Sequence, residues 1–203
     1  MEKNVEFTRK LVLTATMSAL IVMLGITKLG LIPLGPAASI TILHVPIILA
    51  ACFIGLPSAL FTGAVFGIMS LVQAAMSPSG VLDPLFVNPL VSVLPRILTG
   101  LIAWALWFGF NKIPKFPRAV AAGLTAFLAT VCHTLMVIGS LYLFQGAATR
   151  EGMGGLGYFA VIGVLAPQAA LEATAATIIC VAVFAGLFIS TKKKSKLSEE
   201  QEN

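Results

Sequence analysis

The chain has 203 residues, of which 58% are hydrophobic and only 10% are charged, and its formal net charge is +5. This composition lies far outside that of soluble globular proteins, so it excludes an ordinary soluble domain. A bilayer core about 30 Å thick requires about 20 apolar residues per helix, and such runs take up almost the whole chain. We therefore predict a single transmembrane domain over residues 1–203.

Six apolar runs, separated by glycine, proline and charged residues, predict an all-α membrane protein folded as a compact bundle of six transmembrane helices. In chain order the runs cover residues 7–27, 40–55, 57–76, 88–110, 118–144 and 158–191, and residues 192–203 form a basic tail. The first run also has features of a signal peptide, because a basic start precedes it and small residues follow it. Its place in the charge pattern favours a retained span.

Most of the basic residues fall into three groups that are separated by an even number of predicted spans. They are Lys3, Arg9 and Lys10 before the first span, Lys112, Lys115 and Arg118 between the fourth and fifth, and Lys192, Lys193, Lys194 and Lys196 after the sixth. Short loops rich in Lys and Arg stay cytoplasmic. The pattern therefore predicts cytoplasmic N- and C-termini in a multi-pass protein of the plasma membrane, and it explains the positive charge without a nucleic-acid partner.

The three outer connections, residues 28–39, 77–87 and 145–158, contain several glycines or prolines. The first is predicted to be an irregular loop rather than a helix. We hypothesise that the three segments together form a mobile lid over the bundle, with plain connectors as the alternative.

Strongly polar side chains inside the predicted spans are few and unevenly placed. They are His44, Gln73, Asn88, Arg96, His133, Gln168 and Glu172. At about 1.5 Å per residue from the predicted span ends, all of them fall in the outer half of the membrane. Charged groups inside a membrane usually face the bundle interior or a cavity, and a conducting protein carries polar groups along its whole path. The pattern predicts a substrate-binding pocket that is open only to the outside.

Local spacing supports the idea that these side chains converge. Gln168 and Glu172 are four residues apart and share one helix face. Pro89 and Pro95 are expected to loosen the fourth span and to free backbone carbonyls next to Arg96.

Each of these residues also has a structural interpretation that the sequence leaves open. Arg96 and Glu172 can neutralise one another as a buried pair, and the two histidines can be core residues bonded to nearby backbone. Gln73 can bridge two helices, and Asn88 can cap the fourth helix.

Motifs for catalysis, cofactors and metals give no support for an enzyme. The sequence has no P-loop, no His/Cys metal-ligand spacing and no Gly-x-Ser-x-Gly elbow, and the Gly-x-Gly-x-x-Gly match at residues 152–157 lacks the strand that such a motif requires. We predict a non-catalytic protein with no cofactor and no metal site. A hydrolase dyad of Ser92 and His133 is the enzymatic alternative, and no nucleophile motif supports it.

Two pairs of small residues mark close helix contacts. Ala15 and Ala19 lie one turn apart on the first span, and Gly63 and Gly67 form a Gly-x-x-x-Gly pair on the third. Small residues allow helices to approach closely. Packing within the bundle is the preferred interpretation of the glycines, whereas contact with a partner subunit is preferred for the alanines.

Over its whole length the chain resembles the substrate-binding S components of energy-coupling factor (ECF) vitamin transporters, in size, span number, cytoplasmic ends and basic tail. Ala15 and Ala19 match the alanine pair with which that family docks its transmembrane coupling subunit. The stretch Thr-Ile-Leu-His-Val-Pro at residues 41–46 resembles the riboflavin and pantothenate branch, and Asn-Pro-Leu-Val-Ser-Val-Leu-Pro-Arg at residues 88–96 resembles pantothenate-type members.

The resemblance implies a vitamin pocket near the outer face, lined by the fourth to sixth spans and closed by outer loops that include residues 28–39. It also implies docking to a coupling subunit and two ATPase subunits, which supply the energy, and a toppling movement of the S component in the lipid bilayer.

Together these features predict capture of a vitamin from outside the cell, with pantothenate favoured. Arg96 is expected to bind its carboxylate by charge-assisted hydrogen bonds. The hydroxyls and the amide are assigned to four further residues, His44, Asn88, Gln168 and Glu172. The alternatives are another vitamin (riboflavin, cobalamin or a pyrimidine precursor) and a stand-alone channel or secondary carrier.

Overall fold

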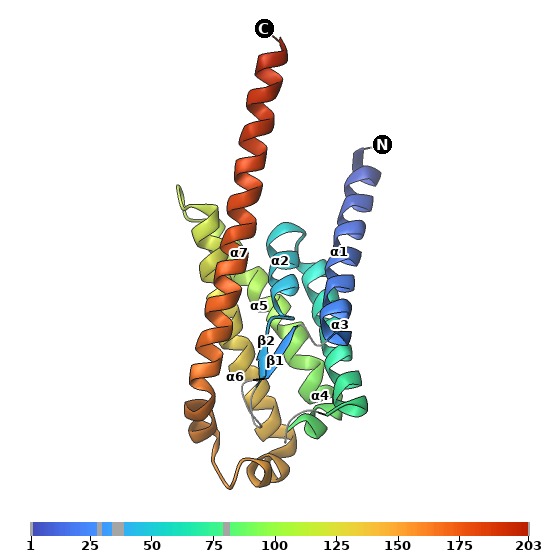
Figure 1. The fold of residues 1–203 in the computed structure, drawn as a ribbon, viewed down its shortest axis with the longest axis vertical. Coiled ribbons are helices and arrows are strands. Elements are labelled where there is room, and N and C mark those ends of the chain that lie inside the picture. The colour runs from blue at the N-terminus through green and yellow to red at the C-terminus, as the bar shows by residue number, and fades with distance from the viewer. Residues whose placement is uncertain (1, 28–29, 34–38, 79–81, 203) are drawn as a thin grey trace.

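A computed structural model gives the structure of residues 2–27, 30–33, 39–78 and 82–202. Within these ranges the helices are α1 (Glu2–Ile26), α2 (Val45–Phe53), α3 (Leu56–Met76), the 3-10 helix η1 (Asp83–Val87), α4 (Pro89–Ser92), α5 (Leu94–Asn111), α6 (Arg118–Gly152) and α7 (Tyr158–Glu202). Two short strands, β1 (Leu31–Pro33) and β2 (Ser39–Thr41), form an antiparallel pair. Figure 1 shows the long helices standing side by side as a bundle.

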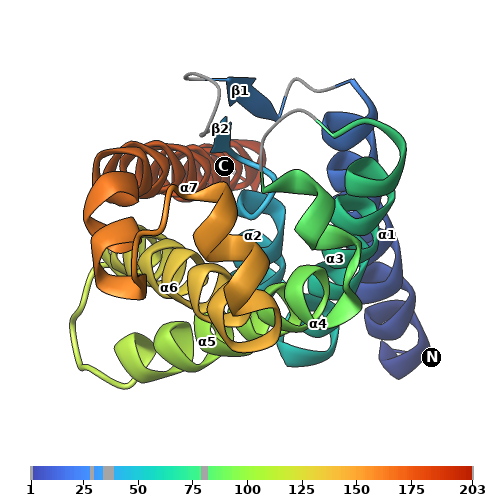
Figure 2. The same ribbon diagram turned by 90° about the horizontal axis from the view of Figure 1, so that it is seen from below.

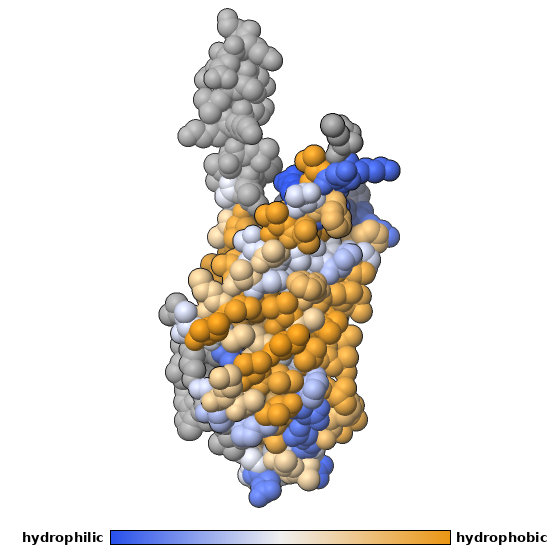
Figure 3. Space-filling view, turned by 90° about the vertical axis from the view of Figure 1, so that its right-hand side faces the viewer, coloured by the Kyte–Doolittle hydropathy of each residue, from blue (hydrophilic) through white to orange (hydrophobic). Residues whose placement is uncertain are grey.

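Five helical segments in the described part of the chain are long and apolar enough to cross a membrane. They are Lys3–Ile26, Leu56–Met76, Pro89–Asn111, Arg118–Gly152 and Tyr158–Gly186. On the face shown in Figure 3, apolar side chains form a broad band between two more polar ends. A band of this kind matches the hydrocarbon core of a bilayer, so the prediction of a helical, multi-pass membrane protein is confirmed.

The second predicted span, residues 40–55, is not confirmed as a helix that crosses the membrane by itself. Its first residues belong to β2, and α2 has only 9 residues, which corresponds to about 14 Å of helix. α2 contacts α1, α3, α5, α6 and α7, and Figure 2 shows it surrounded by other helices. Residues 45–51 are all buried. A helix enclosed by protein is apolar on every face, so this run reflects a protein core rather than contact with lipid.

The first outer loop contains a short β-hairpin. β1 and β2 pair with Leu31 opposite Thr41 and Pro33 opposite Ser39, and β2 contacts α7. The predicted irregular loop at residues 28–39 therefore contains strand structure at both ends, and residues 28–29 and 34–38 lie outside the described part.

The three basic segments of the sequence lie at one end of the bundle. α1 begins there, residues 112–117 connect α5 to α6 there, and the tail of α7 extends from it (Figure 1). We call this the basic end. The opposite, loop end carries η1 and the connection between α6 and α7. α2, α5 and α7 run toward the basic end, and α6 runs away from it.

The predicted loop at residues 145–158 is largely wrong. Gln145 is non-helical, with φ of −142° and ψ of 37°, but the chain then resumes a helix as far as Gly152. The connection to α7 is therefore only five residues long, 153–157. The predicted end of the span at residue 144 agrees with the non-helical Gln145, but the glycines after it led to the prediction of a loop where the helix continues.

Glycines allow α3 and α5 to approach closely. A Cβ atom on Gly63 would lie 2.6 Å from the backbone oxygen of Arg96, and one on Gly67 would meet the backbone of Val93. Both glycines are buried. The interpretation of this pair as packing within the bundle is confirmed, and it brings α3 directly against the segment that carries Arg96.

Candidate functional site

Four buried polar side chains meet inside the bundle and form what we call the central polar cluster. His44 and Thr99 are 0% exposed, and Arg96 and His133 are each 6% exposed. They come from the start of α2, from α5 and from α6. Polar groups buried in this way are costly unless they are paired, so a cluster of them indicates a ligand site or a specific internal network.

The backbone around Arg96 is shaped by the proline one residue before it. Pro95 has no N–H, so the carbonyl of Val91, four residues earlier, loses its helical partner. The Nη1 atom of Arg96 donates a hydrogen bond to this oxygen at 2.8 Å. The predicted freeing of a backbone carbonyl next to Arg96 is confirmed. The freed carbonyl holds the guanidinium inside the bundle.

The guanidinium lies between two aromatic rings and without a carboxylate. Its Cζ atom is 5.5 Å from the ring centre of Phe66 and 5.0 Å from that of Phe86. Its Nη2 makes a long contact of 3.4 Å with Ser70 Oγ, and its Nε has no hydrogen-bond partner among the described residues. In those residues the recorded ion pair is Lys10 with Glu6, so Arg96 is a buried cation that lacks a paired anion.

The two histidine rings stack on one another beside Arg96. Their ring centres are 5.8 Å apart, with an angle of 19° between the planes, and Phe66 lies 6.0 Å from the His133 ring. His133 Nδ1 is 2.9 Å from Thr99 Oγ1. Neither ring nitrogen of His44 makes a hydrogen bond within the described chain, and the Thr41 backbone is its polar neighbour.

Glu172 anchors the hairpin to α7. Its Oε1 accepts hydrogen bonds from the backbone N–H of Thr41 at 2.7 Å and from Nε2 of Gln168 at 3.3 Å. No ion pair joins Glu172 to Arg96 in the described residues, although their charges interact. The two residues therefore influence each other at longer range, without a direct ion pair, and a mutually neutralising pair stays a prediction. Glu172 connects α7 to the strand that leads into His44.

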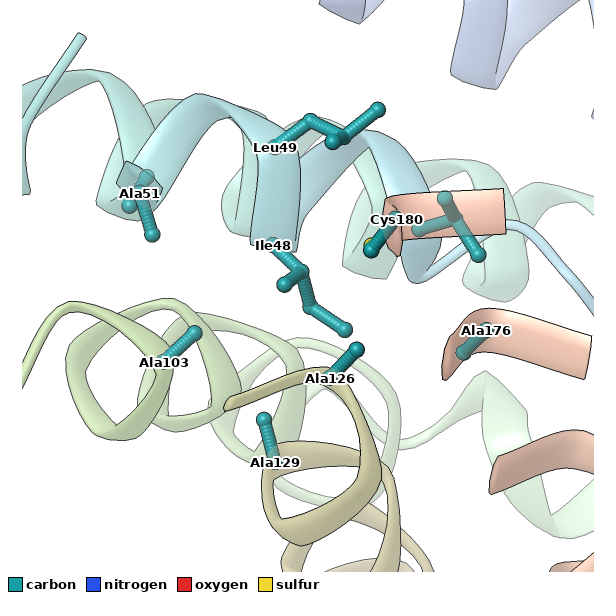
Figure 4. Close-up of a cluster of buried hydrophobic side chains, with 10 residues drawn as sticks. Ile48, Leu49, Ala51, Ala103, Ala126, Ala129, Ala176 and Cys180 are labelled. Carbon is teal, nitrogen blue, oxygen red and sulfur yellow. The ribbon is translucent and has the colours of Figure 1, made fainter. Parts of the chain in front are cut away.

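One turn closer to the basic end, the same four helix faces are apolar. Residues four positions along the chain from His44, Thr99, His133 and Glu172 are Ile48, Ala103, Ala129 and Ala176, all of which are buried. We call these four the apolar layer. They belong to one core cluster with Ala126 and Cys180 (Figure 4). Residues four apart share a helix face, so these four faces change from polar to apolar within one turn.

A family model described as "ECF transporter, substrate-specific component" matches residues 9–184. The chain belongs to this family. The match includes all or most of each of the five long apolar helices, the hairpin and the central polar cluster. Membership identifies the chain as a transport component of an ECF system rather than an enzyme.

Two curated proteins are similar to this S component. A pantothenate transporter, PanT, of Leuconostoc mesenteroides is 34% identical over 138 residues, which are 64% of this chain and 67% of that protein. A pantothenic acid transporter, PanT, of Lactococcus lactis subsp. cremoris is 29% identical over 124 residues, which are 54% of this chain and 60% of that protein.

Of the predicted site residues of the S component, Gln73 and Asn88 have structural roles outside the central polar cluster. Gln73 donates from Nε2 to the backbone oxygen of Gly25 and so connects α3 to the end of α1. The Oδ1 atom of Asn88 accepts from the N–H of Leu90 and caps α4. Both match their structural interpretations. Gln168 donates a hydrogen bond to Glu172 and so belongs to the contacts that hold the hairpin.

The structure adds residues that the sequence did not single out. Thr99 contacts His133, and Phe66 and Phe86 contact Arg96; both partners are predicted site residues. Thr99 lies three residues after Arg96, so helical spacing alone was able to find it. A threonine in a membrane helix commonly bonds its own backbone, however, and carries little signal. The phenylalanines come from distant segments and have no such pattern.

The proposed hydrolase dyad is not assembled. Ser92 Oγ donates to the backbone oxygen of Asn88, and His133 bonds Thr99 instead. In the described residues no group of three His, Cys, Asp or Glu side chains has the arrangement of a metal site.

Proposed function

We propose that this S component captures pantothenate from outside the cell and presents it to an ATP-driven ECF importer. The observation that carries the proposal is the buried guanidinium of Arg96, which lies between two phenylalanines with no carboxylate beside it. Uncompensated buried charge is strongly unfavourable. A ligand carboxylate at Nε and Nη2 would neutralise it through charge-assisted hydrogen bonds.

Pantothenate provides the groups that the rest of the site can bind. It has one carboxylate, one amide and two hydroxyls on a small branched chain. The stacked imidazoles of His44 and His133 offer polar ring atoms beside the guanidinium, and Gln168 and Glu172 offer an amide and a carboxylate near the hairpin. The names of the two similar transporters agree with this substrate.

The surroundings of the cluster support capture rather than conduction. The apolar layer lies directly on the basic side of the cluster and is packed with small and aliphatic side chains. A hydrated path requires polar groups along its length. A stand-alone channel or carrier would need to open this layer, so the proposal assigns the driving force to partner ATPases.

The orientation that we propose places both termini and the basic end in the cytoplasm of a cell, with the protein in the plasma membrane. The positive-inside rule supports it, because the three basic segments share one end of the bundle. The hairpin and the loop end then face outward. Glu172 and Thr41 would hold the hairpin near the entrance of the site.

Isothermal titration calorimetry of the purified protein against a panel of water-soluble vitamins tests the substrate. We expect one binding event for pantothenate and none for riboflavin, cobalamin or a pyrimidine precursor of thiamine. Binding of one of the other vitamins, with no heat from pantothenate, would contradict the proposal.

The proposed docking surface for the coupling subunit is the outward face of α1. Ala15 and Ala19 are both exposed there, and small exposed residues allow a partner helix to approach closely. Changing both to tryptophan should prevent co-purification with the coupling subunit and two ATPases while pantothenate binding persists. Ile178→Trp, at a position on α7 that is 63% exposed, is the matched control and should keep the complex.

A further inference from the structure

We propose that Thr99 is a positioning residue that fixes the tautomer of His133 and thereby selects ligands with a hydroxyl donor. The inference deepens the proposed function and rests on it only for the identity of the ligand. It starts from Thr99 Oγ1, which is buried and lies within hydrogen-bond distance of both the backbone oxygen of Pro95 and His133 Nδ1.

The single hydroxyl proton of Thr99 can serve only one of its two close contacts. Thr99 Oγ1 is 2.8 Å from the Pro95 oxygen and 2.9 Å from His133 Nδ1. A carbonyl oxygen cannot donate, so a contact of 2.8 Å between the two oxygens requires the threonine proton. The contact with Nδ1 then requires a proton on the imidazole. His133 therefore carries hydrogen on Nδ1, an assignment from the bonding pattern rather than from a visible hydrogen.

A proton on Nδ1 determines what the other side of the ring can do. His133 lies beside the buried cation Arg96, and a second buried cation there would be costly. The ring is therefore neutral, and its Nε2 is an acceptor with a lone pair. Within the described chain, Thr99 is the hydrogen-bond partner recorded for this ring, so the Nε2 acceptor remains available to a ligand.

The site then has two different recognition elements close together. The guanidinium of Arg96 binds an anionic group, and Nε2 of His133 accepts a hydrogen bond from a hydroxyl group of the same ligand. An acid without a hydroxyl near its carboxylate would bind only to the guanidinium and would leave Nε2 unpaired. This arrangement selects hydroxylated acids such as pantothenate against acids of the same size that lack hydroxyls.

Nitrogen-15 NMR of the protein in lipid, without any ligand, tests the tautomer directly. The chain has two histidines, and His133→Asn identifies the signals of His133 by their loss. We expect a protonated Nδ1 and an unprotonated Nε2. Thr99→Val should shift the ring toward the other tautomer, Thr99→Ser should restore the original spectrum, and Thr62→Val should leave it unchanged. Thr62 is a matched control, because it is buried and bonds its own helix backbone at Ser58.

Calorimetry then compares pantothenate with N-(3,3-dimethylbutanoyl)-β-alanine, which keeps the carboxylate and amide but lacks both hydroxyls. We expect Thr99→Val to weaken pantothenate binding about tenfold, the scale of one hydrogen bond, and to change binding of the analogue by less than about twofold. Equal losses for both ligands, or a wild-type spectrum with the proton on Nε2, would overturn the inference. A wild-type protein with the expected spectrum but no pantothenate binding would instead contradict the proposed function alone.

Discussion

The central polar cluster and the apolar layer are neighbouring cross-sections of the same bundle, built by the same helices. In the cluster, α5 presents Arg96 and Thr99 and α6 presents His133, whereas one turn toward the basic end these helices present Ala103 and Ala129. Helix packing thus does not decide which section binds a ligand. The difference lies in side-chain chemistry and in the break at Pro95, which exposes a backbone carbonyl on one side of the boundary.

The two sections also differ in how well their groups are satisfied. The apolar layer consists of small and aliphatic side chains that fill space without hydrogen bonds (Figure 4). The cluster has nitrogen atoms of His44 and Arg96 without a hydrogen-bond partner among the described residues. A protein interior rarely leaves such atoms unpaired, which supports the proposal that a ligand completes the cluster.

Removing the cation of the cluster should have the largest effect on binding. Arg96→Ala should weaken pantothenate affinity by at least about 100-fold, because charge-assisted hydrogen bonds contribute about 1.5–3 kcal/mol each. Isothermal titration calorimetry measures the loss, and Arg118→Ala, at an exposed position, is the control. An affinity within about threefold of wild type would remove Arg96 from the site.

Placing a polar group in the apolar layer should destabilise the protein. Ala129 is 0% exposed, and the amide of Ala129→Asn would be buried without partners, at a cost of about 1–3 kcal/mol. Thermal unfolding in detergent measures the effect, and Ala129→Val separates added volume from polarity. If asparagine were tolerated as well as valine, the layer would contain water, and the contrast between the two sections would fail.

Separating α3 from α5 should affect both stability and binding. The added methyl of Gly63→Ala would press on the backbone oxygen of Arg96, and overpacking of this kind costs about 1–3 kcal/mol. We expect a lower unfolding temperature and several-fold weaker pantothenate binding. In Gly109→Ala, where a Cβ would meet nothing within 4 Å, neither the unfolding temperature nor the pantothenate affinity should fall. Equal losses in both variants would point to a general effect of replacing helical glycine.

The smallest expected effect concerns the charge of Glu172. Glu172→Gln keeps a side-chain oxygen for the Thr41 N–H and removes a negative charge near the ligand carboxylate. Pantothenate binding should become tighter by about two- to threefold, as expected when a screened charge that does not contact the ligand is removed. Glu172→Ala removes the anchor of the hairpin and should speed hydrogen exchange at the Thr41 amide. Much weaker binding by the glutamine variant would mean that the charge itself contacts the ligand.

The sequence by itself determined the helical membrane class and located five spans, those at residues 57–76 and 88–110 to within one residue at each end. It also named Arg96, His133, Gln168 and Glu172 as candidate site residues. Apolar length and charge patterning are local properties, and a buried charge stands out against an apolar run. Pro95 also predicted the freed carbonyl next to Arg96, because its missing N–H removes the hydrogen-bond donor of a carbonyl four residues earlier in the same segment.

Only the tertiary structure decided the length of α2 and the partners of each polar group. An apolar run looks the same whether lipid or protein surrounds it, so residues 40–55 gave no sign that α2 is enclosed and short. Likewise, Glu172 bonds Thr41, 131 positions earlier in the chain, and Thr99 bonds His133 across two helices. Such contacts depend on which helix faces meet, and residue spacing within a single helix carries no information about them.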